Sequence, residues 1–251
     1  MDSSKEQEIR NWDLSPLQES IVELALSKQN DDYQERLPVV VRKITDAFPN
    51  DDPGGKAEDF LSNFWDFLIR LGQSLPKSQN DHLVGLVMSL RAEEKGTITI
   101  WGSESSLWHD LPLLGPCMRE SWIDPTLEAG RKDKAEESAR WLNLNSFAAK
   151  LFARGGSDWA NLALWQLRTG LEEEGDFAEA KVLVASEWIR ETGDRIYELC
   201  EAESGVHDEA SARMLAAGPK FNGKPGFSKD RWNFWKTRLS EASKTLSLSL
   251  V

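Results

Sequence analysis

Apolar residues recur three and four positions apart along most of this chain, which is the period of an amphipathic α-helix. Residues 56–75 give the clearest example, with apolar side chains at Phe60, Phe64, Phe67, Leu68 and Leu71. The same period predicts helices near residues 31–48, 79–94, 112–122, 132–154, 157–174 and 177–203. The pattern therefore indicates an all-α protein.

Capping serines and prolines in the sequence predict where several helices begin or are interrupted. Ser15 followed by Pro16 predicts the start of the first helix, and Ser228 predicts the start of the last, over residues 229–244. Pro38 is expected to interrupt or restart the helix at 31–48, because proline removes a backbone donor. Residues 1–14 are expected to be loosely ordered.

Two stretches depart from the helical period. Residues 97–101 alternate with a period of two, and we interpret them as an extended connector, because a lone short strand has nothing to pair with. Residues 204–227 are a loop-rich connector with one short helix at 209–217. We predict an irregular bundle of eight or nine helices in one domain over residues 1–251.

Composition narrows the classes of function. The chain has a formal net charge of -12, which argues against a duplex nucleic-acid partner, because phosphate binding needs a basic surface. Residues 219–244 nevertheless hold seven Lys or Arg against two Asp or Glu, interleaved with Trp232 and Trp235. This segment is either a helix that packs its aromatic side chains on the bundle or a surface for an anion or acidic partner.

The cysteines and the amino terminus indicate an intracellular protein. Cys117 and Cys200 lie in apolar helical patterns outside any CxxC pair, so buried free thiols in a reducing compartment are expected. No secretory signal opens the sequence, and no stretch approaches the ~20 apolar residues that span a bilayer. We predict a cytoplasmic protein.

The motifs of common enzymes do not occur. His82, His109 and His207 lack metal-ligand spacing, and the glycine-rich and nucleophile-elbow motifs are missing, so neither a metal nor another cofactor is expected. The acidic runs Asp51-Asp52 and Glu172–Glu174 are interpreted as solvated surface.

Several tryptophan-containing motifs in the second half of the chain are more specific. They are Trp108–Trp122, Trp141–Leu151, Ala163–Glu172, Ala185–Trp188 and Gly226–Trp235. Together they resemble the fungal family known as domain of unknown function 3632, from about residue 100 to 240. The resemblance implies a wholly helical fungal protein. It also implies a link to secondary metabolism, with hetero-Diels–Alder cyclisation of tropolonic sesquiterpenes as a candidate activity.

A cyclase without a metal or a nucleophile needs aromatic walls that orient its substrate and a few donors that polarise an oxygen. One helix face carries Trp141, Asn145, Ala148 and Phe152. Asn145 is the polar residue on this apolar face, which makes it a candidate catalytic donor. The alternative is a structural Asn bonded to a neighbouring helix.

Other candidates follow the same reasoning. Arg168 shares a face with Trp165 and Glu172, and is either a catalytic donor held by Glu172 or one half of a surface ion pair. His109 is either an acid or base, or an exposed or capping residue, and Asp110 is expected to cap the helix at 112–122. The substrate-binding walls are expected at Trp108, Trp122, Trp141, Phe152, Trp165 and Trp188.

These residues predict an aromatic pocket between the helices at 112–122, 132–154 and 157–203. The leading hypothesis is a cofactor-independent cyclase or isomerase of fungal secondary metabolism that acts on a hydrophobic tropolone or sesquiterpenoid. Two alternatives stay open, a non-enzymatic helical interaction module and a carrier that binds a small molecule unchanged.

Overall fold

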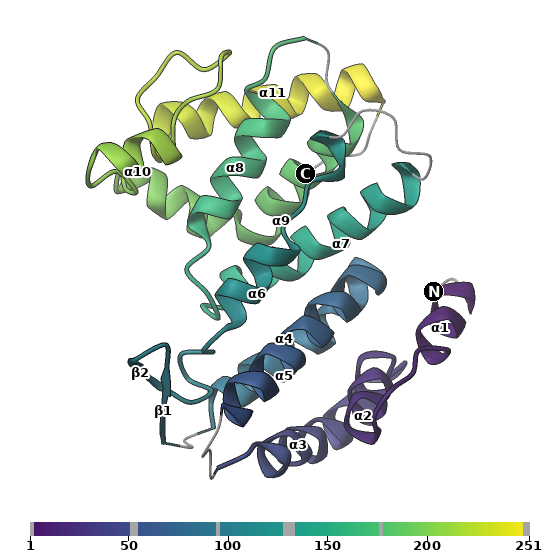
Figure 1. Ribbon diagram of the computed structural model, residues 1–251. Helices are drawn as coiled ribbons and strands as arrows, with labels where there is room; N and C mark the ends of the chain where they lie inside the picture. Colours follow the sequence, from purple (N-terminus) through teal and green to yellow (C-terminus); the bar gives the residue numbers. More distant parts are fainter. Residues whose placement is uncertain (1–2, 51–54, 94–95, 128–133, 176–177, 248–251) are drawn as a thin grey trace. The chain divides into compact units, whose positions relative to one another are not determined.

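The computed structural model describes residues 3–50, 55–93, 96–127, 134–175 and 178–247 (Figure 1). These residues form eleven α-helices, two short 3-10 helices and one two-stranded hairpin, so the all-α prediction is confirmed. The chain divides into two compact units, Met1–Asp124 and Pro125–Val251. The two units are described separately, and the single-domain assignment stays a prediction.

The first unit contains six α-helices, which are α1 (Ser3–Arg10), α2 (Pro16–Ala25), α3 (Asn30–Ala47), α4 (Lys56–Ser74), α5 (Asn80–Arg91) and α6 (Leu114–Ser121), with the 3-10 helix η1 (Lys77–Gln79) before α5. Helices α2, α3 and α5 pack on one another, while α4 contacts α1, α5 and α6. The predicted start of α2 is confirmed: the Ser15 hydroxyl accepts from the Gln18 backbone N–H, and the Gln18 side chain accepts from the Ser15 N–H.

Two predictions about this unit are wrong. Helix α1 lies in the stretch expected to be loosely ordered, where Ile9 is buried and ion pairs such as Arg10–Glu6 (3.0 Å) support the helix. Helix α3 runs through Pro38 without a break. Pro38 and Gln34 are both exposed, so the backbone bond that Pro38 cannot make to Gln34 lies on the solvent-exposed side of α3, and the buried residues of α3 keep their packing.

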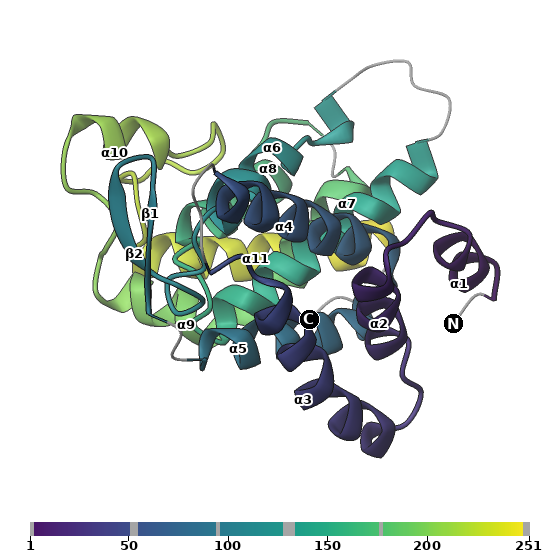
Figure 2. The same ribbon diagram turned by 60° about the horizontal axis from the view of Figure 1, so that its bottom comes forward.

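The extended segment near residue 97 also differs from its prediction. Strand β1 (Thr97–Ile100) pairs antiparallel with β2 (Ser103–Ser106) in a hairpin (Figure 2), with Ile100 opposite Ser103 and Thr97 opposite Ser106. Trp101 and Gly102 form the turn with φ of 51° and 81°. Two consecutive positive φ values suit a two-residue hairpin turn. The turn therefore brings Ser103–Ser106 back alongside β1 as its partner strand, although the composition of this segment does not predict a strand.

The second unit contains the 3-10 helix η2 (Pro125–Leu127) and the helices α7 (Lys134–Ala153), α8 (Ala160–Leu171), α9 (Glu179–Glu201), α10 (Glu209–Met214) and α11 (Lys229–Leu246). Helix α9 is central, because α7, α8 and α11 all pack on it. Gly170 of α8 makes the close approach possible, since a Cβ there would lie 2.7 Å from the Lys181 carbonyl oxygen of α9.

The loop-rich connector at 204–227 and the cap of the last helix are confirmed. The connector contains the short helix α10, which begins with a capping box between Asp208 and Ser211. The Ser228 hydroxyl accepts from the Arg231 backbone N–H at the start of α11. These caps satisfy backbone donors that a helix start leaves open.

Both cysteines are free and buried, as predicted. Burial raises the pKa of the Cys117 thiol to about 12 and that of the Cys200 thiol to about 12. Over the described residues, no helix combines the length and the apolar character that crossing a bilayer requires.

Candidate functional site

Asn145 lies in the core between α7 and α9, where it is fully buried. Its amide Nδ2 donates to the Trp141 carbonyl oxygen over 2.9 Å, and its Oδ1 accepts from Trp188 Nε1 over 2.8 Å. The side chain therefore joins two helices of the second unit, which is the structural arrangement that the sequence left as an alternative. A catalytic role for Asn145 stays a prediction.

Three of the predicted aromatic walls lie around this hydrogen bond. Trp141, Phe152 and Trp188 are all buried, and the rings of Phe152 and Trp188 lie 6.3 Å apart. The guanidinium of Arg195 on α9 lies 4.1 Å from the Phe152 ring centroid and also donates to the Phe152 carbonyl oxygen. The sequence pattern thus places these side chains together, as parts of the interface between α7 and α9.

Trp165 and Arg168 of α8 hold the connector that follows α9. Trp165 Nε1 donates to the Met214 carbonyl oxygen over 2.9 Å, and an Arg168 guanidinium nitrogen donates to the Ala216 carbonyl oxygen over 3.4 Å. Both side chains are half-buried. Their donors bind backbone carbonyls at the end of α10, since Met214 is its last residue and Ala216 follows it, a role that fits structure at least as well as catalysis.

The carboxylate of Glu172 is fully buried in the second unit, which corrects its interpretation as solvated surface. Glu172 is 0% exposed, whereas its neighbours Glu173 and Glu174 are exposed. The expected pair with Arg168 does not form, because both Glu172 oxygens bind Arg231 of α11, at 2.7 Å and 3.1 Å. The other acidic run, Asp51-Asp52, lies outside the described residues.

Arg231 and Glu172 are the centre of a hydrogen-bond network that uses every donor of the guanidinium. The donors that do not reach Glu172 bind the carbonyl oxygens of Leu215, Gly226 and Ala216, at 3.0, 2.8 and 3.0 Å. Such a fully satisfied pair meets the condition under which two buried charges are tolerated.

Two further donors complete the network at the carboxylate. The Gly218 backbone N–H donates to one Glu172 oxygen over 2.6 Å, and Trp235 Nε1 donates to the other over 2.6 Å. The network thereby fastens the connector to both α8 and α11. We conclude that the basic and aromatic pattern at the start of α11 serves packing at Arg231 and Trp235, the first of the two alternatives.

Sequence reasoning did not find this pair, although one signal was present. Arg231 stands at the head of the apolar stripe Trp235, Leu239 and Ala242, at helical spacing. A guanidinium on a buried stripe requires a buried carboxylate. The pattern does not say which carboxylate, since Glu172 lies 59 residues earlier in the chain.

Trp108 belongs to an aromatic cluster of the first unit. It is 0% exposed, and its ring lies 5.8 Å from Phe48, 5.9 Å from Phe64 and 6.3 Å from Trp65. Its backbone has a φ of 65°, an uncommon value for a bulky residue. The Trp108 Nε1 has no hydrogen-bond partner within the part of the chain that the structure describes.

His109 lies on the surface beside Asp110. The His109 side chain is 63% exposed, and its Nδ1 lies 3.0 Å from Asp110 Oδ1. The His109 hydrogen bond, followed by that of the Ser106 backbone N–H, lowers the pKa of Asp110 below its usual value. Asp110 does not cap α6, which begins after Leu113 with no side-chain cap, so that prediction is wrong.

The predicted site residues are divided between the two units. Trp108, His109 and the half-buried Trp122 belong to the first unit, and the others belong to the second. The aromatic pocket therefore stays a prediction. Among the described residues, no group of three or more His, Cys, Asp or Glu side chains could hold a metal ion.

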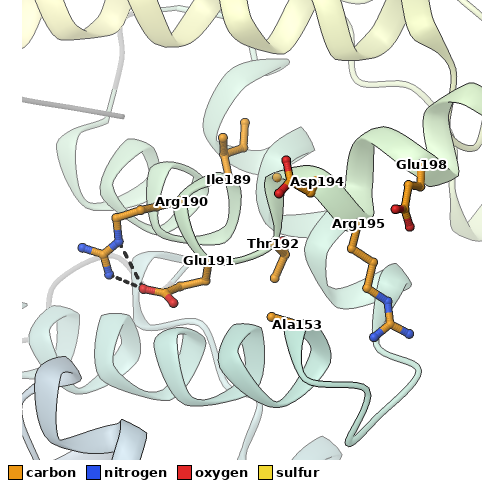
Figure 3. A pocket seen from close by; sticks show the side chains of 9 residues that line it. Ala153, Ile189, Arg190, Glu191, Thr192, Asp194, Arg195 and Glu198 are labelled. Atoms are coloured by element: carbon orange, nitrogen blue, oxygen red, sulfur yellow. Dashed lines mark hydrogen bonds and ion pairs between the residues drawn. The ribbon is translucent and has the colours of Figure 1, made fainter.

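Three surface hollows lie within single units. The largest, about 670 Å³, is lined by α3 residues with Ser89 and Glu93, and a second of about 310 Å³ is lined by residues of α2 and α3. The third, about 570 Å³, lies along α9 beside Ala153 (Figure 3). None of these three is lined by a predicted site residue.

The hollow along α9 is polar, with three acidic and two basic side chains, namely Glu191, Asp194, Glu198, Arg190 and Arg195. Figure 3 shows that these charged groups spread along the helix and do not converge on one point. Arg190 donates to Glu191 Oε1 over 2.7 Å. A site for an apolar substrate would instead show apolar walls with a few converging polar groups.

Trp101 is the most exposed large apolar side chain of the described residues, at 68%. Its Nε1 donates to Glu58 Oε1 of α4 over 2.9 Å, so the indole is oriented while most of its surface stays open to solvent. It occupies the turn of the hairpin at a φ of 51°. The sequence analysis did not single out this residue, because it assigned no turn to the segment.

Comparison with known proteins places the chain in a family. The model of a family described as "Protein of unknown function (DUF3632)" matches residues 65–239, and the chain belongs to this family. No curated protein and no solved structure matches the chain. The family match confirms the resemblance on which the sequence analysis relied, and its description states no activity.

Proposed function

We propose that this protein acts as a non-enzymatic helical module that binds another protein through its surface. The observation that carries the proposal is Trp101. Tryptophan is enriched among the residues that dominate binding energy at protein interfaces, because its large apolar body loses much water on contact. Here it lies exposed at the tip of a hairpin and is oriented by Glu58.

The surroundings of Trp101 support this interpretation. A bulky residue at positive φ costs free energy that a turn of Asn-Gly type would avoid. Burial of the indole offsets little of this free energy, since Trp101 stays 68% exposed. A binding role gives a reason for keeping tryptophan at this position.

The predicted catalytic residues give further support. The Asn145 amide is bonded to Trp141 and Trp188, and Arg168 donates to the connector carbonyl of Ala216. These polar groups stabilise the second unit, and a substrate would have to displace their partners. The cyclase and the carrier stay predictions, which the following experiment also tests.

The test compares proteins that copurify with the wild type and with Trp101→Ala from an extract of the source cell. Ile123→Ala is the matched control, because Ile123 is also exposed, at 65%, in the same unit. We expect a specific set of proteins to be lost with Trp101→Ala and retained with Ile123→Ala. Identical sets for wild type and Trp101→Ala would refute the proposal.

A second arm tests the small-molecule alternatives by thermal shift against tropolones and sesquiterpene alcohols. A ligand at about 100 times its dissociation constant stabilises the folded state by about 2.7 kcal/mol. A shift of the corresponding size, roughly 5–10 °C, would favour the carrier or the cyclase over the interaction module. Product formation from paired hits would then separate those two.

A further inference from the structure

The hairpin has two outer edges, and the described residues of the chain cover the one on β2. On β2, the Ser106 N–H donates to Asp110 Oδ2 over 2.7 Å, and the Ser106 carbonyl oxygen accepts from the Asp110 N–H over 3.0 Å. Asp110 thus occupies both outward backbone groups of Ser106. Capping of this kind is one way in which proteins prevent an edge strand from pairing with another chain.

The described part of the chain places no such cap on the outer edge of β1. The Gly96 carbonyl oxygen accepts from the Leu107 N–H over 2.9 Å, so Gly96 directs its backbone toward the β2 side. Because directions alternate along a strand, Ile98 and Ile100 do the same, and Thr97 and Thr99 direct their N–H and C=O groups outward. Among the described residues, these outward groups have no hydrogen-bond partner, and both threonines are exposed.

We propose that β1 pairs antiparallel with β1 of a second copy of this chain, across a two-fold axis at Ile98. In this register Thr97 lies opposite the second copy's Thr99, and Thr99 lies opposite the second copy's Thr97. Each pair exchanges two N–H···O bonds, so the edge forms four backbone hydrogen bonds with itself. The two hairpins become one four-stranded sheet.

Three features of the edge favour a second copy as the occupant. The outward groups are symmetric about Ile98, so the edge is complementary to itself, as a two-fold interface requires. The strand Thr97–Ile100 contains neither a charged residue nor a proline, which are the residues that oppose pairing at an edge. An isolated two-stranded hairpin is marginal, and added strands stabilise it.

The side chains of the proposed pairing are also compatible. Thr97 and Thr99 stand opposite each other on one face, and threonine pairs are favourable across strands. Ile98, which is half-buried, meets the second copy's Ile98 on the other face and is covered by it. The opposing force is the net charge of -12 on each copy, whose repulsion is screened by salt. We therefore expect dimerisation to strengthen as the salt concentration rises.

The first experiment measures mass by sedimentation over a range of protein concentrations, with Thr99→Pro as the test variant. Proline removes the outward N–H of Thr99 and leaves the bonds to β2 in place. We expect the dimer dissociation constant to rise about tenfold or more. Glu104→Pro is the matched control, because Glu104 lies on β2 opposite Thr99 and directs its N–H to the other edge. It should leave the constant unchanged.

The second experiment uses disulfide formation to read the register. Ile98→Cys places two thiols at a close antiparallel pair, where a disulfide fits. Thr97→Cys faces the second copy's Thr99, so this variant should not cross-link to itself. The native Cys117 and Cys200 do not interfere, because both are buried.

A chain that stays monomeric at every concentration and salt level would overturn the pairing, even if an unrelated extended peptide proved to bind β1. Equal cross-linking of the Ile98→Cys and Thr97→Cys variants would overturn the register. This inference stands apart from the proposed function, since loss of the dimer leaves the partners captured through Trp101 unchanged.

Discussion

Replacing Glu172 by Gln tests whether the buried ion pair holds the second unit together. The substitution keeps the shape of the side chain and removes its charge, so Arg231 stays buried with only carbonyl partners. Each oxygen of Glu172 accepts one donor from Arg231 and a second donor, from Trp235 or from Gly218, and Gln replaces one of these oxygens with an N–H₂ group. At least one of those donors must lose its acceptor.

The expected cost follows from these losses. Removing one partner of a buried ion pair typically destabilises a protein by about 3–5 kcal/mol. For a unit of this size, that corresponds to a fall in the melting temperature of roughly 10–20 °C. The same network holds the connector, so amide exchange at Gly218 and Phe227 should accelerate together with the loss of thermal stability.

The assay is thermal unfolding of the full chain followed by circular dichroism, with Glu173→Gln as the control. Glu173 is exposed next to Glu172, so its substitution should change the free energy of unfolding by less than about 0.5 kcal/mol. In a double-mutant cycle with Arg231→Met, the two substitutions together should cost about 0.5–3 kcal/mol less than their sum. A Glu172→Gln protein that melts within about 2 °C of wild type would refute the reasoning.

Three other predictions follow from contacts within single units. Asn145→Leu leaves the Trp188 N–H buried without its acceptor, so calorimetry should show a loss of about 1–3 kcal/mol, and an unchanged melting temperature would contradict the structural role. In Gly85→Ala, the new Cβ would overlap the Tyr33 hydroxyl oxygen, so the variant should unfold at a lower urea concentration and Tyr33→Phe should restore part of the loss. Additive effects of the two substitutions would argue against the contact. The pKa of Asp110 is lowered in the folded state by the hydrogen bond with His109, so its carboxylate stabilises the hairpin above the ordinary aspartate pKa of about 3.9 and loses this effect as the pH falls through the folded pKa. Amide exchange at Ser106 should then speed up beyond its intrinsic trend, and Asp110→Asn should not show this step.

The helices were predictable because their signals are local. Residues 56–75 became α4 at Lys56–Ser74, and residues 177–203 became α9 at Glu179–Glu201, with differences of a residue or two at the ends. The start of α11 was also marked locally, by Ser228. In each case the periodic apolar face or the capping residue lies within the element that it predicts.

The features that escaped prediction depend on partners elsewhere in the chain. Strand β2 consists of Ser103–Ser106, which has little preference for extended structure, and it pairs through the turn at Trp101 and the cap from Asp110. An Asn on an apolar face is equally compatible with catalysis and with a bridge to Trp188, so periodicity alone could not decide the role of Asn145. Three consecutive glutamates such as Glu172–Glu174 likewise give no local signal of which one is buried.

The order of synthesis matters for the pair between Glu172 and Arg231. The carboxylate is made 59 residues before the guanidinium that neutralises it. At typical elongation rates of roughly 5–20 residues per second, Arg231 is synthesised on the order of 3–12 seconds after Glu172. During that interval the connector carbonyls of Leu215 and Ala216 also lack the bonds that they accept from Arg231. A chain that ends before Arg231 would therefore leave the Glu172 carboxylate without the guanidinium that neutralises it in the folded unit.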